Sequence, residues 1–182
     1  PMREICTVRS VGGADYKRLV NKRGTTGGWV DEDDARTATD PSQLALLTPF
    51  MGEVYAYPQA HYAFWQTVRG QAKVAGELQP GDCGENLTLA GLLESQVWIG
   101  DVLRFPDCEL IVSEPRYPCF KFNAHMGFNQ AAKLMAQSGY CGVYLAVKRE
   151  GHVQAGQAFE LVPGPREVGI VELFKAKMKK KA

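Results

Sequence analysis

The sequence predicts an α+β protein built on a mostly antiparallel β-barrel with peripheral helices. Short strand patterns dominate from residue 53 onward, and the helical patterns between them do not alternate with strands as βαβ units. A chain of 182 residues is the size of one domain and can bury a core. In barrels of this kind, the loops at one mouth carry the functional site.

Strands are expected where apolar and β-branched residues run between turn residues. These runs lie at 5–8, 53–58, 86–90, 95–105, 108–115 and 142–163. A Pro-Asp turn at 106–107 joins the fourth and fifth runs. The last run is predicted to be a hairpin that turns at Glu150 and Gly151.

Helices are expected between and after the strands. Tyr62, Trp65 and Val68 recur at helical spacing, and a second helix runs from Phe128 to a stop at Gly139. The stretch from Arg166 to the end also has a helical pattern. Residues 12–52 are expected to be mostly loop, with a short helix near 42–47.

Composition limits the classes of function. The 21 Lys and Arg residues nearly balance the 20 Asp and Glu residues, which gives no electrostatic case for nucleic acid. No apolar run is long enough to span a membrane, and the first residues lack the apolar core of a signal peptide, so a cytoplasmic location is expected. The lysines of 175–182 are expected to be a solvated helix end, and binding to anionic lipid or RNA is the alternative.

The five cysteines do not form a recognisable framework. Their number is odd and no CxxC pair occurs, which argues against structural disulfides and a structural zinc site. Most are expected to be reduced, buried thiols.

Cys119 is the exception, because it lies in the stretch SEPRYPCFKFN. Arg116 and Lys121 are close in sequence, and cations stabilise a thiolate and lower its pKa. Pro115 and Pro118 stiffen this loop. From the residues alone, a nucleophile or metal ligand and a buried structural cysteine are equally good interpretations.

A second candidate stretch is GDCGENLTLAGL, which surrounds Cys83. Its glycines would let the backbone approach a ligand, and Asn86 could donate and accept hydrogen bonds. A plain turn before a strand explains the same residues, and Cys83 itself is expected to pack in the core.

The histidines give no metal motif. His61 is expected to be packed beside aromatic residues and His152 to lie in the hairpin turn. His125 is close enough in sequence to Cys119 that it could reach the same mouth, which is the less favoured of its two interpretations. No HxH or HxxxH pair, Walker loop or GxSxG motif is present.

Five stretches, in this order, resemble the MOSC family, named for the C-terminal domain of molybdenum cofactor sulfurase, and within it the stand-alone, YiiM-like bacterial members. They are EVYAYPQAHYAFW, GENLTLAGL, VWIGDVLRF, SEPRYPCFKFNAHMG and GVYLAVKREGHVQAGQAFELV, within residues 53–162. We expect a single MOSC domain over 1–182, with 12–52 divergent and 166–182 a C-terminal helix and basic tail.

The resemblance implies a β-barrel that binds molybdenum cofactor, a molybdopterin, with Cys119 as the ligand to molybdenum or as a sulfur carrier. Pyridoxal phosphate binding is also attributed to this family. The residues that the resemblance places at the cofactor are Glu85, Asn86, Thr88, Arg116, Lys121 and Asn123.

The resemblance also implies the reaction. Stand-alone members resemble reductases of N-hydroxylated compounds such as hydroxylaminopurines and amidoximes, which they convert to amines. The chain has no flavin motif and no iron–sulfur cysteine cluster, so a separate reductase is the expected electron donor. A homodimer is a further expectation, and no nucleic-acid or membrane partner is expected.

The sequence departs from the family pattern before residue 53. Where the family has H-G-G-x-x-K, this chain has Leu47, Thr48, Pro49 and Gly52, and only the acidic residues 31–34 could represent its upstream G-D-x-x-x-D. A local reading-frame change and divergence to another ligand or partner both explain this departure.

Three hypotheses therefore remain: a molybdenum enzyme, a non-catalytic carrier of the cofactor or of sulfur, and a metal-free thiol enzyme. The last would use Cys119 as the nucleophile and His125 as the base.

Overall fold

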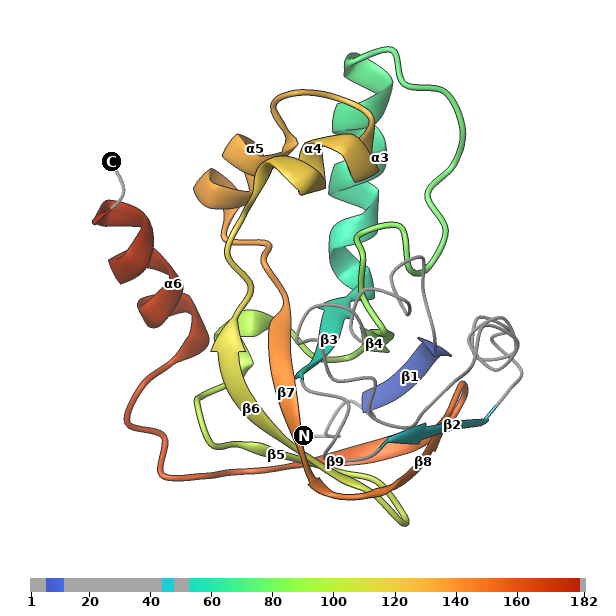
Figure 1. Ribbon diagram of the computed structural model, residues 1–182, viewed down its shortest axis with the longest axis vertical. Coiled ribbons are helices and arrows are strands. Elements are labelled where there is room, and N and C mark those ends of the chain that lie inside the picture. The colour runs from blue at the N-terminus through green and yellow to red at the C-terminus, as the bar shows by residue number, and fades with distance from the viewer. Residues whose placement is uncertain (1–5, 12–43, 48–52, 181–182) are drawn as a thin grey trace, which may run out of the picture.

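The structure is a computed structural model, which describes residues 6–11, 44–47 and 53–180. Seven strands close into a barrel in the order β1-β4-β3-β7-β6-β5-β9 (Figure 1). They are β1 (Cys6–Val11), β3 (Glu53–Pro58), β4 (Leu87–Ala90), β5 (Val102–Arg104), β6 (Glu109–Pro115), β7 (Val143–Arg149) and β9 (Ala158–Val162). Outside the barrel, β2 (Leu44–Leu47) pairs with β8 (Gly151–Gln154).

The barrel is mostly antiparallel, as predicted. The exception is the parallel pair β3–β4, in which Ala56 lies opposite Leu87. A parallel pair needs a long crossover, and here the chain makes it through the 3₁₀ helix η2 (Gln59–His61) and the helix α3 (Tyr62–Gln71). This crossover returns to the barrel at Glu85 and Asn86.

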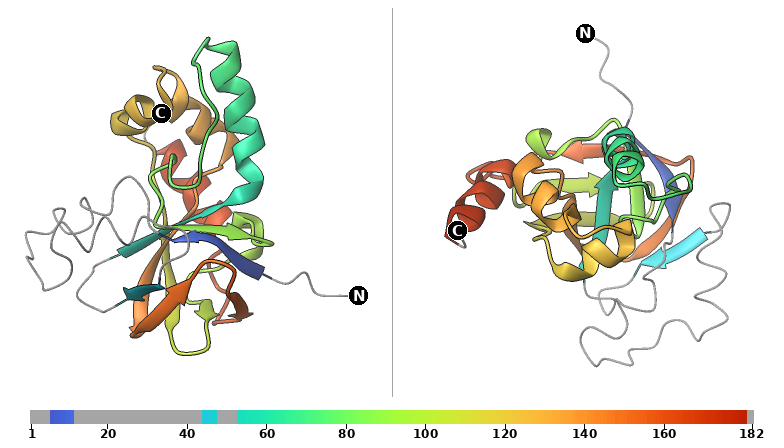
Figure 2. Two further views of the ribbon diagram at one scale, coloured as in Figure 1. Left: turned by 90° about the vertical axis from the view of Figure 1, so that its right-hand side faces the viewer. Right: turned by 90° about the horizontal axis from the view of Figure 1, so that it is seen from above.

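The helices form a layer over one mouth of the barrel. Helix α3, α4 (Phe120–Met126) and α5 (Ala131–Ser138) lie above the strands, and α6 (Ile170–Lys179) lies to one side (Figure 2). The short 3₁₀ helix η3 (Glu94–Gln96) follows β4. No helix among the described residues is long and apolar enough to cross a membrane.

One apolar core runs from the barrel into the helical layer. Trp65 of α3 is fully buried, and its indole N–H donates to the Tyr57 hydroxyl of β3 at 2.6 Å. The ring of Phe122 in α4 meets that of Trp65 edge-on, with centroids 5.1 Å apart. This packing fixes the start of α4, and therefore the loop that precedes it, against the barrel.

Two predictions of local structure are wrong. Residues 44–47 are part of a strand and not of a helix, because a short apolar run has no period that separates the two. The predicted hairpin at Glu150 and Gly151 does not form in the described chain. Strand β7 already has β3 and β6 as neighbours, so β8 leaves the barrel to pair with β2, and β9 pairs with β1 and β5.

Candidate functional site

Cys119 lies where the chain passes from the barrel to the helical layer. Strand β6 ends at Pro115, and Cys119 is the residue immediately before α4, with an extended backbone at φ −141° and ψ 164°. Its side chain is half-buried. The sequence did not predict α4, which is only seven residues long and ends at Gly127 with φ +78°.

Arg116 is buried and connects the two stretches that the sequence identified as candidate sites. Its Nη1 donates to the carbonyl oxygen of Cys83 at 3.1 Å and to the Tyr55 hydroxyl at 3.4 Å. The guanidinium lies over the rings of Tyr55 and Phe122, 4.8 and 5.1 Å from their centroids. The cysteine loop and the GDCGEN loop therefore meet at this arginine.

The charge of Arg116 has no carboxylate partner among the described residues, although only 5% of the residue is exposed. Burial lowers the pKa of Arg116, but the hydroxyls of Tyr55 and Tyr144 and the thiol of Cys119 outweigh it, so the pKa is raised. A buried cation is normally paired. Arg116 is therefore suited to an anionic ligand at the cysteine loop.

Glu85 is a fully buried carboxyl group. One of its oxygens, Oε1, accepts hydrogen bonds from the Tyr62 hydroxyl, from the backbone N–H of Gly81 at 3.1 Å and from the Thr88 hydroxyl at 2.9 Å. Burial raises the pKa of Glu85, and these donors only partly offset it. Oε2 is buried and has no hydrogen-bond partner in the described chain.

Asn86 continues the pairing of β3 with β4. Its backbone N–H donates to the Tyr55 carbonyl at 2.8 Å, and its Oδ1 accepts the Tyr55 N–H at 2.8 Å. Nδ2 is buried without an acceptor among the residues described. The Oδ1 atom of Asn86 thus has a structural role, whereas its Nδ2 group is a donor that no described residue uses.

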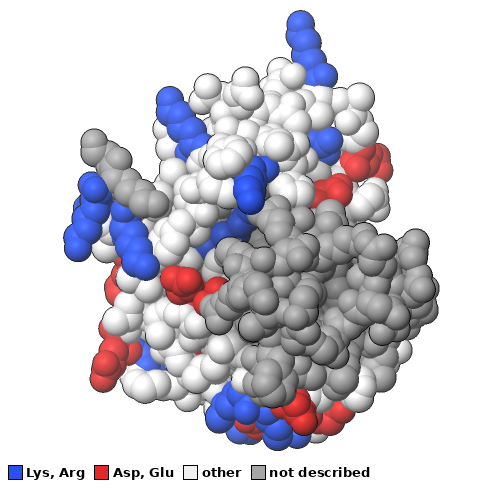
Figure 3. Space-filling view, viewed as in Figure 1, with Lys and Arg blue, Asp and Glu red and all other residues white. Residues whose placement is uncertain are grey.

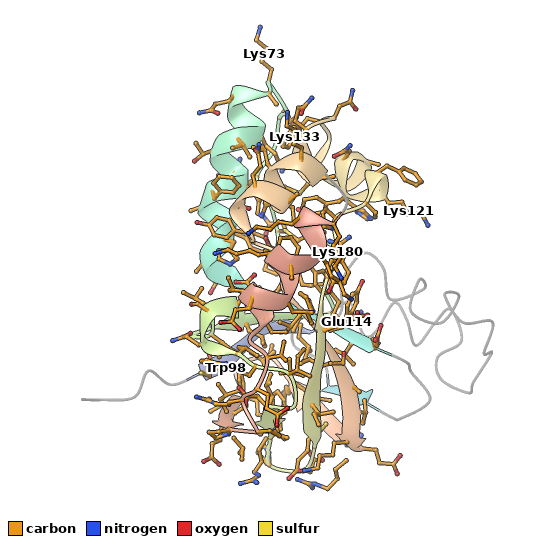
Figure 4. All side chains as sticks on the ribbon, turned by 90° about the vertical axis from the view of Figure 1, so that its left-hand side faces the viewer. Lys73, Trp98, Glu114, Lys121, Lys133 and Lys180 are labelled. Atoms are coloured by element: carbon orange, nitrogen blue, oxygen red, sulfur yellow. The ribbon has the colours of Figure 1, made fainter. Side chains whose placement is uncertain are left out.

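The last two residues that the resemblance placed at the cofactor lie in α4. Lys121 is exposed and projects from the helical layer (Figure 4). Asn123 has a structural contact, because its Oδ1 accepts the backbone N–H of Ala132 at 2.7 Å and so caps the first turn of α5.

His61 is packed, as predicted, and belongs to a buried polar cluster that the sequence did not reveal. Its Nε2 lies 2.7 Å from Oε2 of Glu94, and its ring stacks on Tyr140 at 3.9 Å. Glu94 also accepts the Gly142 N–H at 2.8 Å. The Gly142 carbonyl in turn accepts a hydrogen bond from the backbone N–H of Arg116 at 3.5 Å. The cluster is therefore connected to the backbone of the cysteine loop.

The other two histidines lie in different settings. His125 is half-buried in α4. His152 lies in β8, not in a turn, with Nδ1 3.5 Å from Oδ2 of Asp107. The described part of the chain contains no group of three or more His, Cys, Asp or Glu side chains that could hold a metal ion.

Three residues near Arg116 and Cys119 were not predicted. The rings of Tyr55 and Phe122 lie against the guanidinium of Arg116, and no motif in the sequence indicated these contacts. Phe120 directly follows Cys119 and is 77% exposed, although it is a large aromatic side chain. The position of Phe120 directly after Cys119 was the feature of the sequence that could have identified it as part of the site.

The family model of the MOSC domain matches residues 45–160. This chain belongs to the MOSC domain family. An uncharacterised protein of Bacillus subtilis, YflK, is 39% identical over 109 residues, which are 60% of this chain and 47% of that protein. Protein YiiM of Escherichia coli is 36% identical over 116 residues, 64% of this chain and 51% of that protein. The MOSC chain described here therefore spans about half the length of these relatives.

Solved structures show the same fold. YiiM of Escherichia coli superposes with a TM-score of 0.67 at 28% identity, covering 96% of this chain and 76% of that one. YiiM of Geobacillus stearothermophilus superposes with a TM-score of 0.68 at 26% identity, and the superposition covers 77% of this chain and 71% of that one.

A third relative by sequence comes from Gibberella moniliformis and is called a reductase. It is 31% identical over 158 residues, which are 79% of this chain and 28% of that protein.

The departure from the family pattern lies almost entirely outside the described residues. Thr48, Pro49, Gly52 and the acidic residues 31–34 are not described, and Leu47 is the last residue of β2.

Proposed function

We propose that this MOSC domain is a molybdenum-cofactor-dependent oxidoreductase that reduces N-hydroxylated compounds, such as hydroxylaminopurines and amidoximes, to amines. The observation that carries the proposal is the buried guanidinium of Arg116, which has no carboxylate partner among the described residues, near the half-buried thiol of Cys119. Membership of the MOSC family and the relative called a reductase support it.

The residues present fit this cofactor. Its phosphate needs a cation, and Arg116 is buried without a carboxylate among the described residues. Its metal brings sulfur ligands of its own and needs one soft protein ligand, which Cys119 would supply. The unused Nδ2 donor of Asn86 would serve a polar acceptor on the same group.

The overall reaction consumes two electrons and two protons: R–NHOH + 2 H⁺ + 2 e⁻ gives R–NH₂ + H₂O. When bound, the cofactor supplies the two-electron chemistry that breaks the N–O bond. The protein residues hold and orient it. Arg116 is held between Tyr55 and Phe122, so its charge is fixed in place before any ligand arrives.

The test is to measure molybdenum and released pterin per chain after expression in a host that makes the cofactor. We expect about one molybdenum per wild-type chain, loss of the metal in Cys119→Ser, and loss of most of the pterin in Arg116→Gln. Arg149→Gln, at an exposed arginine on the far end of β7, is the matched control and should load normally.

Turnover is then measured with 6-hydroxylaminopurine and dithionite-reduced methyl viologen. Loaded protein that does not reduce the substrate would favour the non-catalytic carrier instead. Wild-type protein that carries no molybdenum would contradict both.

A further inference from the structure

We infer that the surface beside Cys119 docks an acidic electron-carrier protein, an inference that rests on the proposed function. The surface, which we call the basic helical face, consists of Phe120 and Lys121 of α4, Lys177 of α6, and Lys180 directly after α6. All four side chains are exposed.

The first argument is the uneven distribution of charge in a nearly neutral chain. Between Tyr117 and Val147 the sequence contains the basic residues Lys121 and Lys133 and no Asp or Glu. Helix α6 has three lysines against the single acid Glu172, and Lys180 directly follows the helix. Figure 3 shows basic side chains on the upper and left parts of the molecule, where α5 and α6 lie, and a further basic group at its lower end.

The second argument is that part of α6 is fixed to the cysteine loop. The ring of Tyr117 stacks on Phe174 with centroids 6.1 Å apart, and Nζ of Lys177 lies 4.4 Å from the centre of the Tyr117 ring. Lys177 therefore lies over a residue only two positions before Cys119. Lys180 follows three residues later, on the same side of the helix.

The other two lysines of α6 point elsewhere. Lys175 lines a cavity of about 190 Å³ together with His61 and Glu94, and Lys179 lies one turn after Lys175 on that side. The Lys177 side of α6 therefore faces the loop that leads to Cys119 and α4. Glu114, 3.8 Å from Lys177, lies at the barrel edge of this face, below Lys180 in Figure 4.

The third argument is Phe120, which is 77% exposed and adjacent in sequence to Cys119. An exposed aromatic side chain with a lysine next to it combines an apolar anchor with long-range attraction for an acidic surface. Small, charge-steered interfaces of this kind are typical of transient electron-transfer complexes.

The occupant is an acidic one-electron carrier because the surface is basic and the proposed reaction needs two electrons at the Cys119 site. A lipid surface or an RNA would also attract lysines. Neither would require an exposed aromatic residue next to this cysteine.

The test compares two double variants with the same change of charge on the same helix. Lys177→Glu with Lys180→Glu alters the basic helical face, and Lys175→Glu with Lys179→Glu is the matched control. Reduction of 6-hydroxylaminopurine by the loaded protein is driven by a reduced plant-type ferredoxin, by a reduced flavodoxin, or by methyl viologen.

At about 20 mM salt we expect the first variant to raise KM for the protein donor about tenfold and the control less than about twofold. The viologen-driven kcat should be unchanged in both. Raising salt to about 300 mM should raise the wild-type KM for the protein donor toward that of the first variant. Phe120→Ser should raise KM for the donor by about the same factor at both salt concentrations, because it leaves the lysines in place.

Distinct outcomes would overturn each proposal. Turnover with viologen but with neither protein donor, or equal KM values in the two variants, would show that the face is not a donor site. Equal loss of binding to phosphatidylserine vesicles in both variants, with donor KM unchanged, would show instead a lipid-binding helix. If viologen also drives no turnover, the proposed function fails and the docking inference fails with it.

Discussion

Glu85 shows how a single buried carboxyl group makes stability depend on pH. Burial raises its pKa, so the folded protein holds this proton more tightly than the unfolded chain does. The stabilisation is therefore fully present below the unfolded pKa of about 4.3 and is lost as pH rises through the folded pKa.

Glu85→Gln should remove this dependence, because the amide oxygen keeps the three donors of Tyr62, Gly81 and Thr88 and never ionises. The free energy of unfolding of the variant, relative to that of the wild type, should increase between pH 4 and pH 8. We expect an increase of about 1.4 kcal/mol for each unit by which the folded pKa is raised. Urea titrations at both pH values measure it. The same change at the exposed Glu160 should produce no such gain.

Gly142 is a second residue whose identity is fixed by its surroundings. It has φ +66°, and a Cβ there would lie 2.6 Å from the Ala56 carbonyl oxygen and 2.8 Å from the rings of Tyr55 and Tyr57. We expect Gly142→Ala to lower the free energy of unfolding by at least about 2 kcal/mol. Gly139→Ala separates the cost of the backbone conformation from the cost of the steric clash. Gly139 also has positive φ, but a Cβ there would have nothing within 4 Å, so the substitution should cost only about 1 kcal/mol.

At the scale of elements, α6 supports the cysteine loop through one stacked ring. Phe174 is 1% exposed and stacks on Tyr117. Phe174→Ala should lower the free energy of unfolding by about 3–5 kcal/mol and let the loop move away from the barrel.

In a Cys6→Ser background, the rate at which Cys119 reacts with a disulfide reagent measures that movement. Cys83, Cys108 and Cys141 are buried, whereas Cys6 is half-buried like Cys119 and would otherwise react as well. We expect faster labelling of Cys119 in native buffer. Val168→Ala, at an exposed residue just before α6, should leave both stability and labelling near wild type. Unchanged labelling in Phe174→Ala would mean that α6 does not restrain the loop.

For the whole molecule, β9 is the strand that closes the barrel, because it pairs with both β1 and β5. Phe159 of β9 packs on Phe105, with ring centroids 5.2 Å apart. Phe159→Ala should lower the free energy of unfolding by about 3–5 kcal/mol. Because barrel and helices share one core, circular dichroism and tryptophan fluorescence should still report one transition, and two separate transitions would contradict a shared core.

The sequence predicted the barrel because alternating strands and turn residues are local signals, as at Glu53–Pro58 and at the turn before Glu109. It could not predict the pairing of β8 with β2 or the cluster of His61, Glu94 and Gly142, because both depend on contacts between distant segments. Cys119 was identifiable from its neighbours in sequence. That Arg116 is buried against Cys83 and Tyr55 required the fold.

The same closure has a consequence for how the chain is made. Thr7 of β1 pairs with Ala158 of β9, the last strand of the barrel in the sequence. During synthesis, one edge of β1 therefore stays unpaired until almost all the other strands have left the ribosome. Until then its unpaired N–H and C=O groups are open to any passing strand. A chaperone that covers nascent β1 should therefore raise the yield of folded protein more than one that acts on the finished chain.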